Sequence, residues 1–263
     1  MSIISNIEWT DSTWNPTRGC SKVSAGCKNC YAETFAERFR GVKGHPFEFG
    51  FDLRVIKEKL YEPIKWVSPR KIFVNSMSDL FHEKIDDEYI YKVFSVMKIA
   101  DWHTYQVLTK RPERMEKLFS SKLKEFAKCE HIWIGVSVEN KNHGLQRIKV
   151  LQQTNVSMRF LSIEPLLEDI GELNLNKINW VIVGGESGPR ARPMKEEWVI
   201  PILESCNKAQ IPFFFKQWGG VRKHETGRTL KGRIYNSFPR IESKEAPIRQ
   251  TIVDKLKIAA SFI

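Results

Sequence analysis

Short apolar segments alternate along this chain with longer amphipathic ones. The apolar, β-rich runs predict strands at 71–75, 104–109, 131–137, 158–163, 179–184 and 211–216, with an earlier strand around 4–9. Helical spacing of apolar residues predicts helices at 31–40, 86–100, 112–126, 141–153 and 195–209. The strands are nearly continuous apolar runs, which is typical of a parallel sheet covered by helices.

This order of elements predicts an α/β fold. Six or seven βα units within residues 1–218 favour a partial or complete (β/α) barrel. An open, doubly wound sheet is the alternative, because strand order cannot be read from a sequence. The alternation stops after Gly219, so residues 219–263 are predicted to form a C-terminal extension that packs on the barrel.

Polar residues follow each predicted strand, at the edge where a βα barrel builds its active site. Any one of them can be a helix cap or a turn residue, since Ser, Asp and Asn are common there. Glu and Lys recurring at the same edge favour a functional site instead. The candidates are Ser76, Ser78, Asp79, Lys110, Ser137, Glu139, Glu164, Glu186 and Lys216.

The formal net charge is +11, and it is unevenly distributed. From Val221 to the end there are ten Lys and Arg against four Asp and Glu, so this tail carries +6. Such a surface favours polyanions, with nucleic acid as a possible partner, although a solvated basic surface is the alternative. Aromatic residues near the tail arginines could stack on bases or could equally anchor the tail to the barrel: Trp218, Tyr235 and Phe238, with Arg222, Arg228 and Arg233.

The first residues lack the basic and apolar regions of a secretory signal. No apolar stretch approaches the ~20 residues that cross a bilayer, so we expect a cytoplasmic protein without membrane contact.

Three of the five cysteines are clustered. Cys20, Cys27 and Cys30 form Cys-x6-Cys-x2-Cys, after the first predicted strand and before a helix beginning near Tyr31. Clustered thiols in an intracellular chain indicate a metal or catalysis rather than disulfides. Three thiolates can bind three irons of a [4Fe–4S] cluster and leave the fourth iron open for a ligand.

Two other metal sites stay open at this point. A structural zinc usually needs four protein ligands, and the fourth would be His82, His103 or His131 from elsewhere in the chain. A four-cysteine cluster would need Cys129 or Cys206, each far away in sequence.

The segments 15–20 and 26–32 resemble the cluster loop of radical S-adenosylmethionine (SAM) enzymes, with spore photoproduct lyase as the nearest branch. The whole chain, from about residue 6 to about residue 239, is similar to a phage-associated three-cysteine family of unsettled function. This likeness rests on an ordered set of segments: 7–10, 13–16, 108–112, 136–140, 162–166, 184–188, 215–219 and 227–233.

The resemblance implies a partial barrel with a [4Fe–4S] cluster at its mouth and SAM across the strand ends. It implies that Ser76, Ser78 and Asp79 bind the methionine end of SAM. Ser137 and Glu139 would face the ribose, with Arg147 as a carboxylate partner. The deeper pocket, for substrate or proton transfer, would be lined by Lys110, Glu164, Glu186 and Lys216, for each of which a structural ion pair is the alternative.

The chain departs from the radical SAM pattern in three ways. The first cysteine spacing is six residues instead of three, so 21–25 must loop out. Asn29 stands where these enzymes carry an aromatic residue near the adenine, and an amide can still hydrogen-bond there. The Gly-Gly-Glu triplet at 184–186 follows a later strand than the methionine-binding triplet of those enzymes, so that role is not transferred to it.

Three functions therefore stay open. The first is a radical SAM enzyme acting on nucleic acid or a nucleotide, with a reductant protein of flavodoxin or ferredoxin type. The second is a radical SAM enzyme acting on a peptide or small molecule. The third is a non-catalytic, metal-stabilised nucleic-acid-binding protein.

Overall fold

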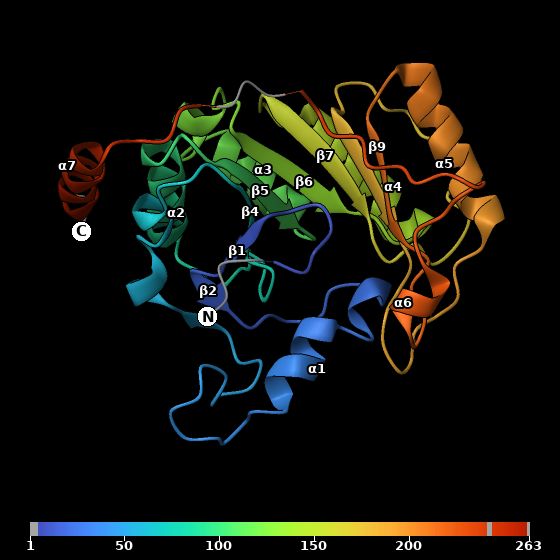
Figure 1. Cartoon of the computed structure of the whole chain (residues 1–263), viewed down its shortest axis with the longest axis horizontal. Coiled ribbons are helices and arrows are strands. Elements are labelled where there is room, and N and C mark those ends of the chain that lie inside the picture. Colours follow the sequence, from blue (N-terminus) through green and yellow to red (C-terminus); the bar gives the residue numbers. More distant parts are fainter. Residues whose placement is uncertain (1–4, 241–243, 262–263) are drawn as a thin grey trace.

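The computed structural model describes residues 5–240 and 244–261. Its main element is a parallel sheet of seven strands in the order β1-β4-β5-β6-β7-β8-β9. This order follows the chain without reversal, so the doubly wound alternative is wrong. The sheet curls into a half-barrel whose edges are β1 and β9 (Figure 1), which makes the barrel partial. The strands are Ser12–Trp14, Lys71–Val74, Thr104–Thr109, Ile132–Ser137, Met158–Ile163, Trp180–Gly184 and Phe213–Gln217.

Four helices connect the strands and pack on the outer face of the sheet (Figure 1). They are α2 (Asp87–Ile99), α3 (Pro112–Phe119), α4 (Lys141–Gln153) and α5 (Glu196–Ala209). Outward-facing strand residues such as Ile72, Val107 and Val183 are fully buried against them. Burying these apolar faces is the main favourable term that stabilises the sheet.

The inward face of the sheet changes character along the strands. Near the amino ends it carries aromatic residues that form a second apolar cluster with Trp9: Phe73, Trp133, Phe160, Trp180 and Phe214. Near the carboxyl ends the same faces carry Ser137, Ser162 and Lys216. Gly135 makes room for the Phe160 ring, since a Cβ there would lie 2.5 Å from it. The half-barrel therefore has an aromatic floor and a polar upper layer, because side chains two residues apart share a face.

A long insertion separates β1 from β4. We call residues 20–59 the N-terminal arm; it contains α1 (Tyr31–Glu37) and lies on the open side of the curled sheet (Figure 1). The short strands β2 (Thr17–Arg18) and β3 (Arg54–Val55) pair antiparallel at its base. Single turns of 3-10 helix complete the insertion at Ala25–Cys27, Lys57–Lys59 and Pro63–Lys65.

The C-terminal segment packs on the half-barrel. After α6 (Lys223–Thr226) the chain runs beside β9, where Phe215 N donates to Tyr235 O (3.0 Å) and Ser237 N to Phe213 O (3.2 Å). Phe238 closes the aromatic floor, with ring centroids 4.9 Å from Trp180 and 5.3 Å from Phe214. Helix α7 (Arg249–Ala260) then docks near α2, where Lys255 pairs with Asp101 at 3.1 Å.

Three predicted elements differ from the structure, and one of them is the helix expected over 31–40, which ends at Glu37. The strand expected around 4–9 is wrong: Ile4 lies outside the described residues, 5–9 are not a strand, and β1 begins only at Ser12. The helix expected over 112–126 ends at Phe119, and only Lys124–Phe126 forms a further 3-10 turn. Ser121 Oγ donates to the Lys117 carbonyl at 2.7 Å, a side-chain bond that competes with helix continuation.

Helices long and apolar enough to cross a membrane are absent from the part of the chain described.

Candidate active site and cysteine loop

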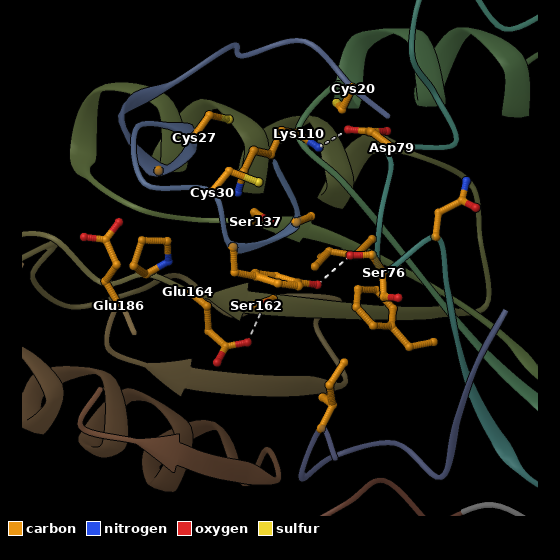
Figure 2. A pocket seen from close by; sticks show the side chains of 18 of the residues that line it. Cys20, Cys27, Cys30, Ser76, Asp79, Lys110, Ser137, Ser162, Glu164 and Glu186 are labelled. Carbon is orange, nitrogen blue, oxygen red and sulfur yellow. Dashed lines mark hydrogen bonds between the residues drawn. The ribbon is translucent and has the colours of Figure 1, made fainter. Parts of the chain in front are cut away.

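A cavity of about 470 Å³ lies at the carboxyl edge of the sheet. All three clustered cysteines line it, from the arm, and strand ends line it from the sheet (Figure 2). Most of the predicted site residues also line it: Asn29, Ser76, Ser78, Asp79, Lys110, Ser137, Glu164, Glu186 and Lys216. Glu139 and Arg147 do not.

The Cys27 thiol is close enough to each of the other two to affect its pKa. Burial and the Asp79 carboxylate raise the pKa of Cys20 to about 11, against the opposing effect of Arg111. Burial also raises the pKa of Cys30, while backbone N–H groups at the start of α1 oppose the increase. Cys27 adds a smaller increase to both pKa values. Figure 2 shows Cys27 and Cys30 together and Cys20 beside Asp79. No group of three His, Cys, Asp or Glu side chains that could hold a metal ion occurs within 5–240 and 244–261.

Glu139 connects the cysteine loop to the sheet from behind the cavity wall. Its side chain is fully buried, with Lys110 Nζ at 3.0 Å and Arg147 Nη1 at 2.8 Å. Ser24 Oγ, on the cysteine loop, donates to it at 2.7 Å. Burial alone would raise the pKa of Glu139, but the two cations and the Ser24 hydroxyl outweigh it and lower this pKa. Gly26 packs so closely that a Cβ would lie 2.5 Å from Glu139 Cγ.

Glu186 holds the other end of the same loop. Asn29 Nδ2 donates to Glu186 at 3.0 Å, and Arg192 donates to both carboxylate oxygens through its side chain. Arg192 also donates to the Ala25 carbonyl at 3.0 Å. These hydrogen bonds lower the pKa of Glu186 although burial opposes them. Two carboxylates from the ends of β6 and β8 thus fix the loop between Cys20 and Cys30.

Arg111, which the sequence analysis did not select, supports Cys20. Its Nη1 donates to Cys20 Sγ at 3.5 Å and to Asp79 at 3.1 Å. Its Nη2 donates to the backbone and side-chain oxygens of Ser21. Asp79 also accepts from Phe81 N, Thr109 Oγ1 and Lys110 N, so four donors already satisfy this carboxylate.

The serines after β4 hold the segment that leads into the cysteine loop. Ser78 Oγ donates to Gly19 O at 2.8 Å and accepts from Thr17 Oγ1 at 2.9 Å. Ser76 Oγ donates to the Asn15 side chain at 3.3 Å. The carbonyl of Ser76 accepts from Tyr31 Oη at 2.5 Å, which links α1 to β4 across the cavity.

The sheet side of the cavity carries the remaining polar groups. Lys216 Nζ lies 3.2 Å from Glu164 Oε1, and Ser162 Oγ donates to the other Glu164 oxygen at 3.1 Å (Figure 2). Gly184 leaves space for this carboxylate, because a Cβ there would lie 2.4 Å from Glu164 Oε1. Ser137 lines the cavity beside them. This side therefore offers hydroxyl groups and one cation–carboxylate pair to a ligand.

Sequence reasoning missed four residues of this site. Arg111 and Arg192 hold the cysteine loop, Ser162 supplies a hydroxyl on the sheet, and Tyr31 crosses the cavity. Arg111 and Ser162 stand in strand-end segments that carry other candidates, so position was an available signal. Arg192 follows a loop with no pattern that points to the cysteines.

Fold and site together define a class: a parallel (β/α) half-barrel with a polar cavity at its carboxyl edge and a three-cysteine loop across it. The chain belongs to the family described as protein of unknown function (DUF5131), whose sequence profile matches residues 4–239. No curated protein and no solved structure matches the chain.

Proposed function

We propose that this protein is a radical SAM enzyme whose [4Fe–4S] cluster is bound by Cys20, Cys27 and Cys30. The observation that carries the proposal is the placement of all three thiols in one cavity at the carboxyl edge of a parallel half-barrel. Active sites of βα barrels lie at this edge. Three cysteines are also one ligand fewer than a closed four-ligand site needs, which suits a metal centre with an open position.

The surroundings of the thiols fit a cluster with a net positive iron core. Burial raises the pKa of Cys20 and Cys30, so the thiolates that bind metal are costly to form until a cation is present. A cubane holds its cysteine ligands around the outside of an inorganic core, so its thiols need not converge on a position the size of one ion. Arg111 donates to Cys20 Sγ, a contact that stabilises negative charge on sulfur.

When bound, the cluster would supply one electron to SAM, releasing methionine and a 5′-deoxyadenosyl radical that abstracts hydrogen from substrate. The residues of this chain would do the rest. Glu139 and Glu186 keep the cysteine loop in place from two sides. Ser137, Ser162 and the Lys216–Glu164 pair remain available to bind SAM or substrate, and Tyr31 helps to exclude water.

The geometry changes the part proposed for some residues. Six residues expected to bind SAM or substrate instead hold the cysteine loop or the segment before it. We propose that they act on the site through that loop; they are Asn29, Ser78, Asp79, Glu139, Arg147 and Glu186. The substrate we propose is nucleic acid or a nucleotide, which the net charge of +11 supports. A flavodoxin or ferredoxin type of protein would supply the electron.

Anaerobic reconstitution with iron and sulfide tests the proposal. We expect a brown protein that releases 5′-deoxyadenosine and methionine from SAM under dithionite, and a Cys27→Ala variant that does neither. Cys206→Ala is the matched control, because that residue is part of α5, is buried and does not line the cavity. A colourless protein with stoichiometric zinc, or undiminished cleavage by Cys27→Ala, would contradict the proposal.

A further inference from the structure

In the part of the chain that the structure describes, the exposed aromatic side chains are confined to one region. Among the residues described, the Phe, Tyr and Trp side chains classed as exposed are Tyr31 (57%), Phe35 (43%) and Phe49 (46%). All three lie on the N-terminal arm. The arm also carries three exposed valines, Val23, Val42 and Val55. With the three rings, it holds six of the thirteen large apolar side chains exposed in the described part. Exposed apolar groups gathered in this way mark a binding surface.

Contacts on the arm hold two of these rings in place, and the third lines the cavity. Phe35 packs edge-on against Phe39 and Phe47, with ring centroids 5.2 and 5.5 Å away. Phe49 has the guanidinium of Arg54 over its ring, 4.0 Å from the centroid. Tyr31, one helical turn before Phe35, lines the cavity itself. Figure 1 shows α1 and the loop after it on the open side of the half-barrel.

The charge around the rings is positive. The arm contains eight Lys and Arg against five Asp and Glu. Lys22 forms an ion pair with Glu33, and Arg40 is shared between Glu37 and Asp52. No ion pair is found, within the described ranges, for five exposed cations of the arm: Lys28, Arg38, Lys43, Arg54 and Lys57. Stacking rings interleaved with free cations are the features that bind single-stranded nucleic acid without base readout.

The aromatic side chains in and beside the described part of the basic tail, by contrast, are packed. Phe238 lies on Trp180 and Phe214, and Tyr235 packs on Phe213 with centroids 5.5 Å apart. Trp218 Nε1 donates to Thr229 O at 2.8 Å. In the described part of the tail, these rings are therefore packed and not free to stack on bases.

We infer that the N-terminal arm binds single-stranded nucleic acid, with bases stacking on Phe35 and Phe49 and phosphates meeting Arg54 and its neighbours. The cavity of about 470 Å³ is large enough for one drug-sized ligand. With SAM bound in the cavity, only a small part of a substrate can enter it. This suits a strand that inserts a single nucleotide into the cavity beside Tyr31. Binding to the arm stands independently of the cluster; that the strand is the substrate rests on the proposed function.

Fluorescence anisotropy with a labelled single strand of about 16 nucleotides tests the inference, in both DNA and RNA form, on protein carrying its metal as purified. We expect binding that weakens as salt rises. Phe35→Ala and Phe49→Ala should each weaken it about tenfold, since loss of one base–aromatic stack typically costs that much. Arg54→Gln should weaken it and reduce the salt dependence.

Two controls are matched to these variants. Leu145→Ala removes an apolar side chain with the same 43% exposure as Phe35, from α4. Arg233→Gln removes an exposed cation from the tail. Both should bind as the unmodified protein does, and circular dichroism should show equal unfolding temperatures for all variants.

Three results would overturn the inference. One is the absence of strand binding at low salt, and another is binding that only Arg233→Gln weakens. In the third, the arm variants bind the strand as the unmodified protein does but are reduced more slowly by flavodoxin. That result would make the arm a docking surface for an acidic redox protein. The first two results are read from strand binding alone, so they are independent of the proposed function, whereas the third also requires the cluster.

Discussion

At the scale of single residues, Glu139 determines how the cysteine loop is held. It accepts from Lys110, Arg147 and the loop hydroxyl of Ser24 while fully buried. A buried ion pair contributes little to the free energy of unfolding when it is intact, because desolvation offsets the attraction. Removing one partner, however, leaves a buried charge uncompensated.

Glu139→Gln should therefore lower the free energy of unfolding by about 3 kcal/mol, measured by urea denaturation. The reconstituted variant should also hold less iron. Glu88→Gln, which breaks an exposed pair with Lys122, should change stability by less than about 1 kcal/mol. Equal effects of the two substitutions would show that Glu139 does not have this structural role.

Arg111→Gln tests the contact with Cys20. Loss of a cation and of an N–H···S bond should destabilise the reduced, more negative cluster, so the midpoint potential should fall. The measurement is a redox titration followed by EPR. Glu83→Gln is the control, because it removes an exposed partner of Arg111 and leaves the contact with Cys20. A fully loaded Arg111→Gln protein with an unchanged potential would rule out this effect.

His103 lies outside the site, and its burial gives the fold a pH dependence. It is 1% exposed, and burial lowers its pKa from 6.5 to about 4. The folded state thus prefers the neutral imidazole. The contribution of His103 to the stability of the folded state is therefore full above pH 6.5 and is lost as pH falls toward 4.

The free energy of unfolding should fall by about 2 kcal/mol from this group between pH 7 and pH 5. Urea denaturation at both pH values measures it. His103→Asn should show a smaller change with pH, whereas His224→Asn, at an exposed position, should match the unmodified protein. The same pH dependence in His103→Asn would exclude this explanation.

At the scale of elements, the C-terminal segment completes the barrel floor. Phe238→Ala removes a half-buried ring from Trp180 and Phe214 and should cost about 2 kcal/mol of unfolding free energy. Cluster content should not change, because Phe238 and its ring partners Trp180 and Phe214 do not line the cavity with the cysteines. Ile234→Ala, 61% exposed, should be neutral in the same denaturation experiment. A neutral Phe238→Ala would mean that this segment does not stabilise the half-barrel.

Elements with strong apolar runs could be predicted from sequence, and short ones could not. The runs that became β5 to β9 are long enough for their burial to decide their structure. Strand β1 has only three residues, Ser12–Trp14, and forms because Trp14 is buried beside β4. The apolar residues before it instead supply Trp9 to the barrel interior. Tertiary packing overrides local propensity in both cases.

At the scale of the whole molecule, the sequence predicted which residues lie at the cavity better than it predicted what they contact. Strand-end positions identified Lys110, Glu164, Glu186 and Lys216, because parallel strands bring their carboxyl ends to one edge. The contacts that hold the cysteine loop join distant parts of the chain. Ser24 donates to Glu139 across 115 residues, and Arg192 donates to Ala25 across 167. A linear pattern does not contain such pairs, so residues that hold the loop were expected to touch SAM.

The central claim is that three thiols bind a cluster with one iron open to SAM. EPR of the anaerobically reconstituted and reduced protein tests it most directly, with iron and sulfide counted on the same sample. The account predicts about four irons per chain and a cluster signal that changes when SAM is added, both lost in Cys27→Ala. A reduced cluster whose spectrum is the same with and without SAM, or a protein that takes up zinc in place of iron, would contradict it.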